Sequence, residues 1–308
     1  MTRPASARRP AGTAALLLLA LALAGCGGDG GDAGAPAEDP TPSEAMPTPA
    51  AEDARVPMDP TGEDQLPPAI VGEGGELMGS DLRYISGDTL TTGYLAVPAG
   101  EGPFPALVII HEWNGLVDRV RHVADDLAAE GYVTLAVDLY DGRTGSDREE
   151  NMALVQEVRG DEAKMLANMN AAVAYLRQRD DVTGRVGAMG WCFGGGIALS
   201  FGLGGAQHEA TGIFYGQLLT DPAELEAMDH EVYGTFAELD EGIPPEQVEE
   251  FVQALDAAGI GHDVHVYDDV NHGFWLRVDE DPEARREPAL DAWQRLKAYL
   301  GRTLGSQG

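Results

Sequence analysis

A cysteine between two glycines marks the place where this sequence is best suited to chemistry. The apolar run 186–189 has the character of a buried strand and leads into Gly190-Trp191-Cys192-Phe193-Gly194, after which an apolar helical segment follows. This strand, turn and helix, with Gly-x-Cys-x-Gly at the turn, is typical of a nucleophile elbow in which cysteine replaces serine. The glycines have a steric reason, because a side chain at Gly190 or Gly194 would collide with neighbouring backbone.

A packed cysteine with no chemical role is the alternative, since cysteine also behaves as a small hydrophobic residue. Glycines at both flanking positions favour the nucleophile. Such a nucleophile needs a base and a group that orients the base. Of the seven histidines, His272 is the best placed, because it lies in a loop after the last predicted strand and is followed by Gly273.

Three acidic residues follow the predicted strand 232–237 and are candidates for the orienting group. We favour Asp240 over Glu238 and Glu241, because aspartate suits the turn that follows a strand. The resulting order along the chain is Cys192, Asp240, His272. This is the order of the catalytic triad in α/β-hydrolases.

A second candidate group follows the apolar run 106–110. In this fold class the loop after that strand supplies one backbone amide of the oxyanion hole, here that of Trp113, and the residue after the nucleophile, Phe193, supplies the other. Glu112 would lie beside this hole, where a carboxylate costs stability unless it is hydrogen-bonded or takes part in chemistry. His111 and Glu112 have no matching third ligand, so we expect no metal and no cofactor.

Alternating strand and helix patterns surround these residues. The predicted strands are 94–97, 106–110, 133–137, 186–189, 213–215, 232–237 and 263–267. The predicted helices are 120–130, 161–178, 244–258 and 283–300. Such alternation implies a mostly parallel sheet with helices on both faces. The expected fold class is therefore α/β, with the α/β-hydrolase arrangement.

The N-terminus has the features of an export signal. Arg3, Arg8 and Arg9 precede the apolar run 14–24, and Leu23-Ala24-Gly25-Cys26 resembles a bacterial lipobox. The resemblance implies cleavage before Cys26 and a lipid on its sulfur, which predicts an exported lipoprotein at a periplasmic or extracellular membrane face. An ordinary secretory signal and a membrane span are the alternatives, although the run is shorter than the roughly 20 residues that a span needs.

The remaining composition divides the chain and limits its partners. We expect a signal peptide over 1–25, a lipidated Cys26 with a disordered acidic Pro/Gly-rich linker over 26–75, and one hydrolase domain over 76–308. The formal net charge of −32 excludes phosphate-backbone contacts, so no nucleic-acid partner is expected. We expect a monomer. A saline habitat, in which salt screens this charge, is a hypothesis that full stability in salt-free buffer would oppose.

Four motifs together resemble the dienelactone hydrolase family over roughly residues 80–300. They are Gly190–Gly195, His111-Glu112 with Gly115-Leu116, Asp138-Leu139-Tyr140, and His272-Gly273-Phe274. The resemblance implies that Cys192 is the nucleophile, His272 the base, Asp240 its partner and Glu112 a residue that helps to form the thiolate when substrate arrives. A thiol protected in this way would suit a protein exposed to oxidants.

The same resemblance bears on the substrate. Family members that open dienelactones hold the substrate carboxylate with arginines, for which the counterparts Arg143 and Arg277 each stand one residue late, and Tyr140 lies near the first. We therefore predict cleavage of a small ester or lactone. A catalytically silent binding protein on the same scaffold is one alternative. A thiol redox protein is a second alternative, but it would need a resolving cysteine, and the predicted lipid on Cys26 prevents that residue from serving as one.

Overall fold

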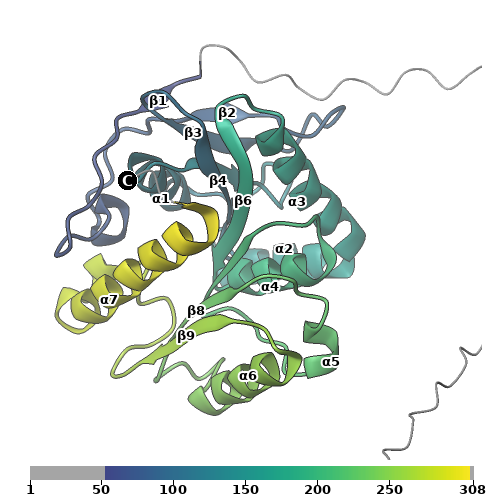
Figure 1. Ribbon diagram of the computed structural model, residues 1–308, viewed down its shortest axis with the longest axis vertical. Coiled ribbons are helices and arrows are strands. Elements are labelled where there is room, and N and C mark those ends of the chain that lie inside the picture. The colour runs from purple at the N-terminus through teal and green to yellow at the C-terminus, as the bar shows by residue number, and fades with distance from the viewer. Residues whose placement is uncertain (1–52, 306–308) are drawn as a thin grey trace, which may run out of the picture. The chain divides into compact units, whose positions relative to one another are not determined.

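A mostly parallel sheet forms the centre of the computed structural model, which describes residues 53–305 (Figure 1). The strands are β1 (Arg55–Val56), β2 (Ser80–Leu82), β3 (Gly93–Pro98), β4 (Phe104–Ile110), β5 (Val133–Val137), β6 (Val182–Trp191), β7 (Ala210–Phe214), β8 (Val232–Ala237) and β9 (His262–Tyr267). Their order across the sheet is β1-β3-β5-β4-β6-β7-β8-β9, and β2 pairs with β3. From β5 to β9 the neighbouring strands are parallel, while β3 is antiparallel to β2 and β5.

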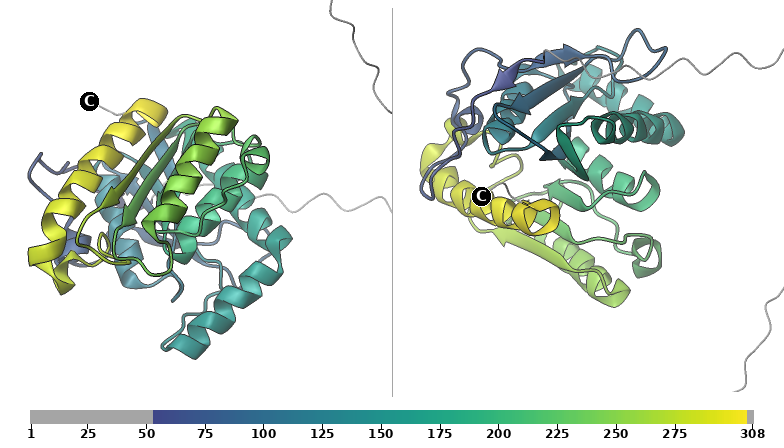
Figure 2. Two further views of the ribbon diagram at one scale, coloured as in Figure 1. Left: turned by 90° about the horizontal axis from the view of Figure 1, so that it is seen from below. Right: turned by 45° about the horizontal axis from the view of Figure 1, so that its top comes forward.

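Helices cover both faces of this sheet (Figure 2). They are α1 (Asp118–Ala129), α2 (Arg148–Gly160), α3 (Glu162–Arg177), α4 (Phe193–Gly204), α5 (Pro222–Leu225), α6 (Pro245–Ala258) and α7 (Pro282–Leu300). Short helical turns are η1 (Pro68–Val71), η2 (Val278–Glu280) and the π-helical η3 (Gly301–Gly305). The arrangement is the α/β-hydrolase fold, as the sequence predicted.

The alternation of side chains along β4 shows how the two layers form. Leu107 and Ile109 join the core cluster beneath α1 and α7, whereas Ala106, Val108 and Ile110 join the cluster beneath α3 and α4. Successive side chains of a strand point to opposite faces, so an uninterrupted apolar run can fill both layers at once. The core therefore lies above and below β4, β5 and β6, at the centre of the sheet.

The predicted elements match the observed ones closely in the middle of the chain. The strands predicted over 133–137 and 232–237 have the observed bounds, and the four predicted helices coincide with α1, α3, α6 and α7 to within two residues. β7 ends one residue earlier and starts three residues earlier than predicted. The polar helix α2 and the short elements β1, β2, η1 and α5 were not predicted.

The folded part begins earlier than the predicted residue 76. β1 pairs in parallel with β3, and Val56 and Ile70 are fully buried in the main core. The indole N–H of Trp293 donates to Oγ of Thr61 at 2.8 Å, which fixes this segment to α7. Residues 53–75 thus belong to the fold, because their few apolar side chains are buried against α1 and α7. This corrects the expected linker.

The predicted signal peptide and Cys26 lie outside the described residues. Among residues 53–305, no helix has the length and apolar character needed to cross a membrane.

Candidate active site

Cys192 occupies the sharp turn between β6 and α4, with φ of 55° and ψ of −118°. A positive φ is costly for a residue with a side chain and persists where the surroundings enforce it. The enforcement is visible at Gly190, where a Cβ would lie 2.5 Å from the carbonyl oxygen of Gly194. The N–H of Cys192 donates to the carbonyl of Phe214 at 2.9 Å, which ties the turn to β7. The structure thus confirms the strained turn predicted from the glycines.

His272 and Asp240 form a close pair. Nδ1 of His272 lies 2.6 Å from Oδ2 of Asp240, which is 5% exposed. The other carboxylate oxygen of Asp240 accepts the N–H groups of Gly242 at 2.9 Å and Ile243 at 3.2 Å. Burial alone would raise the pKa of Asp240, but the hydrogen bonds from His272 and these amides hold it below its usual value.

The competing acids do not contact the histidine. Oε2 of Glu238 accepts the N–H of Asp269 at 3.0 Å, and no hydrogen bond joins Glu241 to His272 in the described residues. Of the three candidates, Asp240 is therefore the residue that orients the ring.

His272 also contacts Cys192, and these two neighbours determine its charge. Burial alone would lower the pKa of His272, whereas the hydrogen bond to Asp240 and the interaction with Cys192 raise it to about 10. The ring is thus protonated at neutral pH. A protonated ring at this position can donate a proton to a leaving oxygen, as acyl transfer requires.

Aromatic packing holds the elbow and the histidine loop together. Trp191, which precedes the nucleophile, stacks on Trp275 with ring centroids 5.7 Å apart and an angle of 14° between the planes. Tyr215, at φ of 38°, sets the edge of its ring against His272 at a centroid distance of 5.0 Å. Both contacts join positions far apart in the chain, so they fix the ring relative to the thiol.

The predicted oxyanion hole lies between the turn after β4 and the first residue of α4. The first N–H groups of a helix have no partner within the helix, and Phe193 is the first residue of α4. Within the described residues, neither its N–H nor that of Trp113 donates to another backbone carbonyl outside regular elements. His111 holds the turn, since its Nε2 accepts the N–H of Leu139 at 3.2 Å and its Nδ1 faces the carbonyl of Glu112 at 2.6 Å.

Glu112 is buried and forms an ion pair with Arg277. Its side chain is 4% exposed, whereas that of Arg277 is 28% exposed. Burial raises the pKa of Glu112, and the positive charges of Arg277, His272 and Arg119 oppose this rise. The ion pair explains how a carboxylate can be accommodated at this buried position.

Comparisons with known proteins place the chain in a family. Residues 91–304 match the model of the dienelactone hydrolase family. A protein of Methylorubrum extorquens described as "putative carboxymethylenebutenolidase" is 30% identical over 245 residues, which cover 75% of this chain and 83% of that protein. The chain belongs to the dienelactone hydrolase family. It is accordingly a dienelactone hydrolase-like hydrolase.

Solved structures agree with the fold. A dienelactone hydrolase-like promiscuous phosphotriesterase from metagenomic libraries has a TM-score of 0.64 at 22% identity, with 73% of this chain and 98% of that chain covered. A thermophilic esterase of Thermogutta terrifontis has a TM-score of 0.55 at 17% identity and covers 74% and 93% of the two chains.

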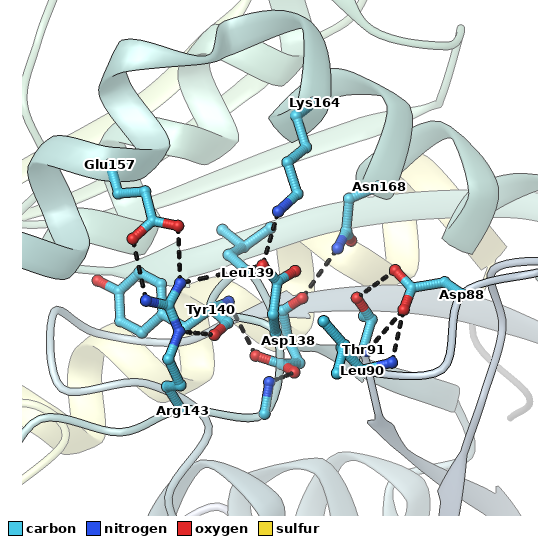
Figure 3. A network of polar contacts seen from close by, with 12 residues as sticks. Asp88, Leu90, Thr91, Asp138, Leu139, Tyr140, Arg143, Glu157, Lys164 and Asn168 are labelled. Carbon is cyan, nitrogen blue, oxygen red and sulfur yellow. Dashed lines mark hydrogen bonds and ion pairs between the residues drawn. The ribbon is translucent and has the colours of Figure 1, made fainter.

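The two arginines expected to bind a substrate carboxylate have different surroundings in this family member. Arg143 donates through both terminal nitrogens to Glu157, at 2.8 and 3.0 Å, and through Nε to the carbonyl of Tyr140 at 2.8 Å (Figure 3). Its hydrogen-bonding groups are thus largely occupied. Arg277 pairs with Glu112 and, more loosely, through Nε with Glu280 at 3.6 Å.

Tyr140 has a structural contact of its own. Its hydroxyl donates to the carbonyl of Trp113 at 3.0 Å, and its ring packs edge-on against His111 at 4.6 Å. Burial raises the pKa of the phenol, and the neighbouring Cys192 raises it further. Tyr140 therefore supports the turn that carries Trp113.

Sequence reasoning missed Tyr215, which contacts His272. The predicted strand 213–215 includes Tyr215 as its last residue, whereas β7 ends at Phe214. Among residues 53–305, no group of three or more His, Cys, Asp or Glu side chains is arranged to hold a metal ion.

Proposed function

We propose that this protein is an exported, lipid-anchored hydrolase that cleaves a carboxylic ester or lactone with Cys192 as nucleophile. The observation that supports this most strongly is the arrangement of His272, which is hydrogen-bonded to Asp240 and whose pKa is raised by the neighbouring Cys192. The backbone strain at Cys192 adds to it, since such strain is maintained at functional turns. The family membership supports the reaction class.

The proposed reaction has two steps. The Cys192 thiolate attacks the carbonyl carbon, the amides of Trp113 and Phe193 hold the oxyanion, and the bond to the leaving oxygen breaks as His272 transfers its proton to that oxygen. His272 then takes a proton from water, and the hydroxide attacks the thioester. Cleavage of the carbon–sulfur bond releases the acid and regenerates the thiolate.

Glu112 and Arg277 suggest how the substrate is held. An acid-bearing lactone would place its carboxylate on Arg277, because the guanidinium of Arg143 is already bonded to Glu157. Arg277 would then exchange Glu112 for the substrate, and the released carboxylate could act on the thiol. Iodoacetamide labelling of Cys192 tests this step: slow labelling that a carboxylate-bearing analogue accelerates supports it, and labelling at an unchanged rate opposes it.

The anchor rests on the sequence of residues 1–26. Metabolic labelling with palmitate should modify the full chain and should fail in Cys26→Ala, with the wild-type protein in the membrane fraction. Equal labelling of both proteins would exclude lipidation at Cys26.

The decisive experiment compares p-nitrophenyl esters and small lactones as substrates for wild type, Cys192→Ala and His272→Ala. His262→Ala is a matched control, because His262 pairs with Asp256 on α6 at 3.2 Å, away from the site. We expect losses in kcat of about a thousandfold or more for the two site variants and little change in the control. Equal rates in wild type and Cys192→Ala would refute the cysteine mechanism and favour the silent binding protein.

A further inference from the structure

Arg119, on α1, binds two parts of the chain that are far apart in the sequence. Its Nη1 donates to the carbonyl oxygens of Ala69 at 3.2 Å and Leu276 at 3.1 Å. Its two terminal nitrogens also donate to the carboxylate of Asp279, at 2.8 and 2.9 Å. A guanidinium paired in this way has a fixed orientation, because its donors lie in one plane. Arg119 therefore fastens both η1 and the segment 276–280 to α1.

Arg277 lies in the segment 276–280, next to the histidine of the site. One of its terminal nitrogens pairs with Glu112. The other lies against Gly273, the residue after His272, where a Cβ would be 2.9 Å from Nη1 of Arg277. The place of the guanidinium beside the site therefore depends on the path of the segment 276–280.

The backbone of Leu276, which precedes Arg277, is held from both sides. Its N–H donates to the hydroxyl of Tyr215 at 3.3 Å, and its carbonyl accepts from Arg119. Arg285 also donates to the carbonyl of Arg277 at 2.7 Å. Loss of the Arg119 side chain would thus leave the segment in place as a whole, but with the buried carbonyl of Leu276 free to shift.

The turn η1 supports the same contact from the other side. The N–H of Ala69 donates to Oδ2 of Asp126 at 2.9 Å, which ties η1 to α1 a second time. Gly72 ends η1 with φ of 79°, and a Cβ there would lie 3.0 Å from Oδ2 of Asp279. The support of the segment 276–280 thus includes a turn that precedes the part of the chain matched by the family model.

We infer that Arg119 is a positioning residue that holds Arg277, through the segment 276–280, where it binds the carboxylate of a substrate. The inference rests on the proposed function, in which Arg277 receives that carboxylate. Arg119 acts without touching the substrate, since its guanidinium is bonded to Asp279 and to two carbonyl groups. Its loss should therefore weaken the binding of substrates that carry a carboxylate and spare neutral esters.

The test measures kcat and KM for two p-nitrophenyl esters of the same length, with the background of Cys192→Ala subtracted. One is the monoester of fumaric acid, which carries a carboxylate, and the other is the crotonate, which has a methyl group in its place. Arg119→Gln should raise KM for the fumarate by about tenfold, as expected when a charge-assisted hydrogen bond is weakened, and should leave kcat/KM for the crotonate within about twofold of wild type.

Two further variants show whether Arg119 acts through Arg277. Arg119→Lys keeps the charge but not the planar fork, so it should resemble Arg119→Gln. In the background of Arg277→Gln, which removes the direct contact, Arg119→Gln should have no further effect on KM for the fumarate.

Arg177→Gln is the matched control for Arg119→Gln. Arg177 is 34% exposed against 30% for Arg119, and it likewise pairs with a carboxylate, that of Glu209, and donates to a backbone carbonyl, that of Gly184. These contacts lie near the amino ends of β6 and β7, at the edge of the sheet opposite the site. Arg177→Gln should leave the kinetics of both esters unchanged.

Gly72→Ala tests the same support without altering Arg119, because the new methyl group would press on Asp279. It should raise KM for the fumarate by about threefold or more and spare the crotonate. Gly259→Ala is its control, since Gly259 has a similar φ of 75° and no atom lies within 4 Å of the new Cβ. Thermal unfolding verifies that each variant is folded, and Gly72→Ala decides the question if Arg119→Gln does not fold.

The possible failures are distinct. Equal changes for both esters in Arg119→Gln and Gly72→Ala, or a wild-type KM in Arg119→Lys, would overturn the inference while carboxylate binding by Arg277 stands. Equal losses for both esters in Arg277→Gln would refute carboxylate binding by Arg277 and the inference with it. Hydrolysis that does not depend on Cys192 would refute the proposed function and, with it, the inference.

Discussion

Replacing Arg277 with glutamine should destabilise the protein in a strongly pH-dependent way. The substitution removes the cation that pairs with Glu112, whose side chain is 4% exposed. Breaking a buried pair from one side typically costs about 3–5 kcal/mol. Arg277 is 28% exposed, so water already screens part of its charge and lowers the expected cost to about 2–4 kcal/mol near pH 8.

The loss of stability in Arg277→Gln depends on pH because Glu112 can take up a proton and become neutral. Keeping a glutamic acid neutral against an ordinary pKa of about 4.3 costs about 5 kcal/mol at pH 8 and about 1 kcal/mol at pH 5. These costs set an upper limit on the loss of stability in Arg277→Gln, because the variant can always bury Glu112 in its neutral, protonated form. Burial already raises the pKa of Glu112 in the wild type, so its contribution to stability is present at low pH and lost as pH rises through the folded-state value. Removing the positive charge of Arg277 raises the folded-state pKa of Glu112 further.

Urea unfolding of wild type and Arg277→Gln at pH 5, 6.5 and 8 measures the difference in free energy of unfolding. The difference should be largest at pH 8 and should fall to about 1 kcal/mol or less at pH 5. His272, with a pKa of about 10 in the folded protein, is present in both proteins, so its contribution to the pH dependence cancels in the difference. A penalty of the same size at pH 5 and pH 8 would refute the reasoning, because it would show that lost packing, and not charge, is responsible.

Three further predictions concern other parts of the fold. Gly190→Ala should lower the free energy of unfolding by more than about 3 kcal/mol, because its Cβ would lie 2.5 Å from a backbone oxygen. The control Gly160→Ala, where no atom lies within 4 Å of the new Cβ, should be neutral or slightly stabilising. Similar effects of the two substitutions would contradict the steric argument. Asp126→Asn should stabilise the protein by about 1–2 kcal/mol at pH 8 and by less at pH 5.5. Burial raises the pKa of Asp126 to about 7, so the contribution of this group to stability is lost as pH rises through that value. An equal gain in unfolding free energy from the substitution at both pH values would contradict this prediction. Cys192→Ala should lower the pKa of His272 below about 10 in an NMR titration of the ring, because Cys192 raises this pKa; an unchanged pKa would show that Cys192 has no effect on the ring.

The sequence was most informative where one local pattern determines the structure. The apolar run 133–137 and the turn around Cys192 are of this kind, since a strand needs only its own residues and a strained turn needs only its glycines. Helix α2 was not predicted because only Asn151, Leu154 and Val155 of its 13 residues are buried. Residues 53–75 were misjudged for a related reason: their composition is polar, but the few apolar side chains find a core that other parts of the chain supply.

Long-range contacts explain what the sequence could not give for the site. Glu112 and Arg277 are 165 residues apart, and their ion pair depends on the positions of β4 and of the loop after β9. The family resemblance predicted that Arg277 binds a substrate carboxylate, and only the fold shows that it pairs with Glu112. The resemblance made the same prediction for Arg143. Its pairing with Glu157 depends on α2, a helix that the sequence analysis did not predict.

The sheet order explains why the site residues meet. Glu112, Cys192, Tyr215, Asp240 and His272 each follow the carboxyl end of a different strand, namely β4, β6, β7, β8 and β9. These five strands are parallel and consecutive in the sheet, so their carboxyl ends lie along one edge. A site built in this way takes its precision from the register of buried strands, although its residues lie in loops. It follows that substitutions in the core of β6 to β8 which disturb the register should alter the contact of His272 with Cys192 before they unfold the protein.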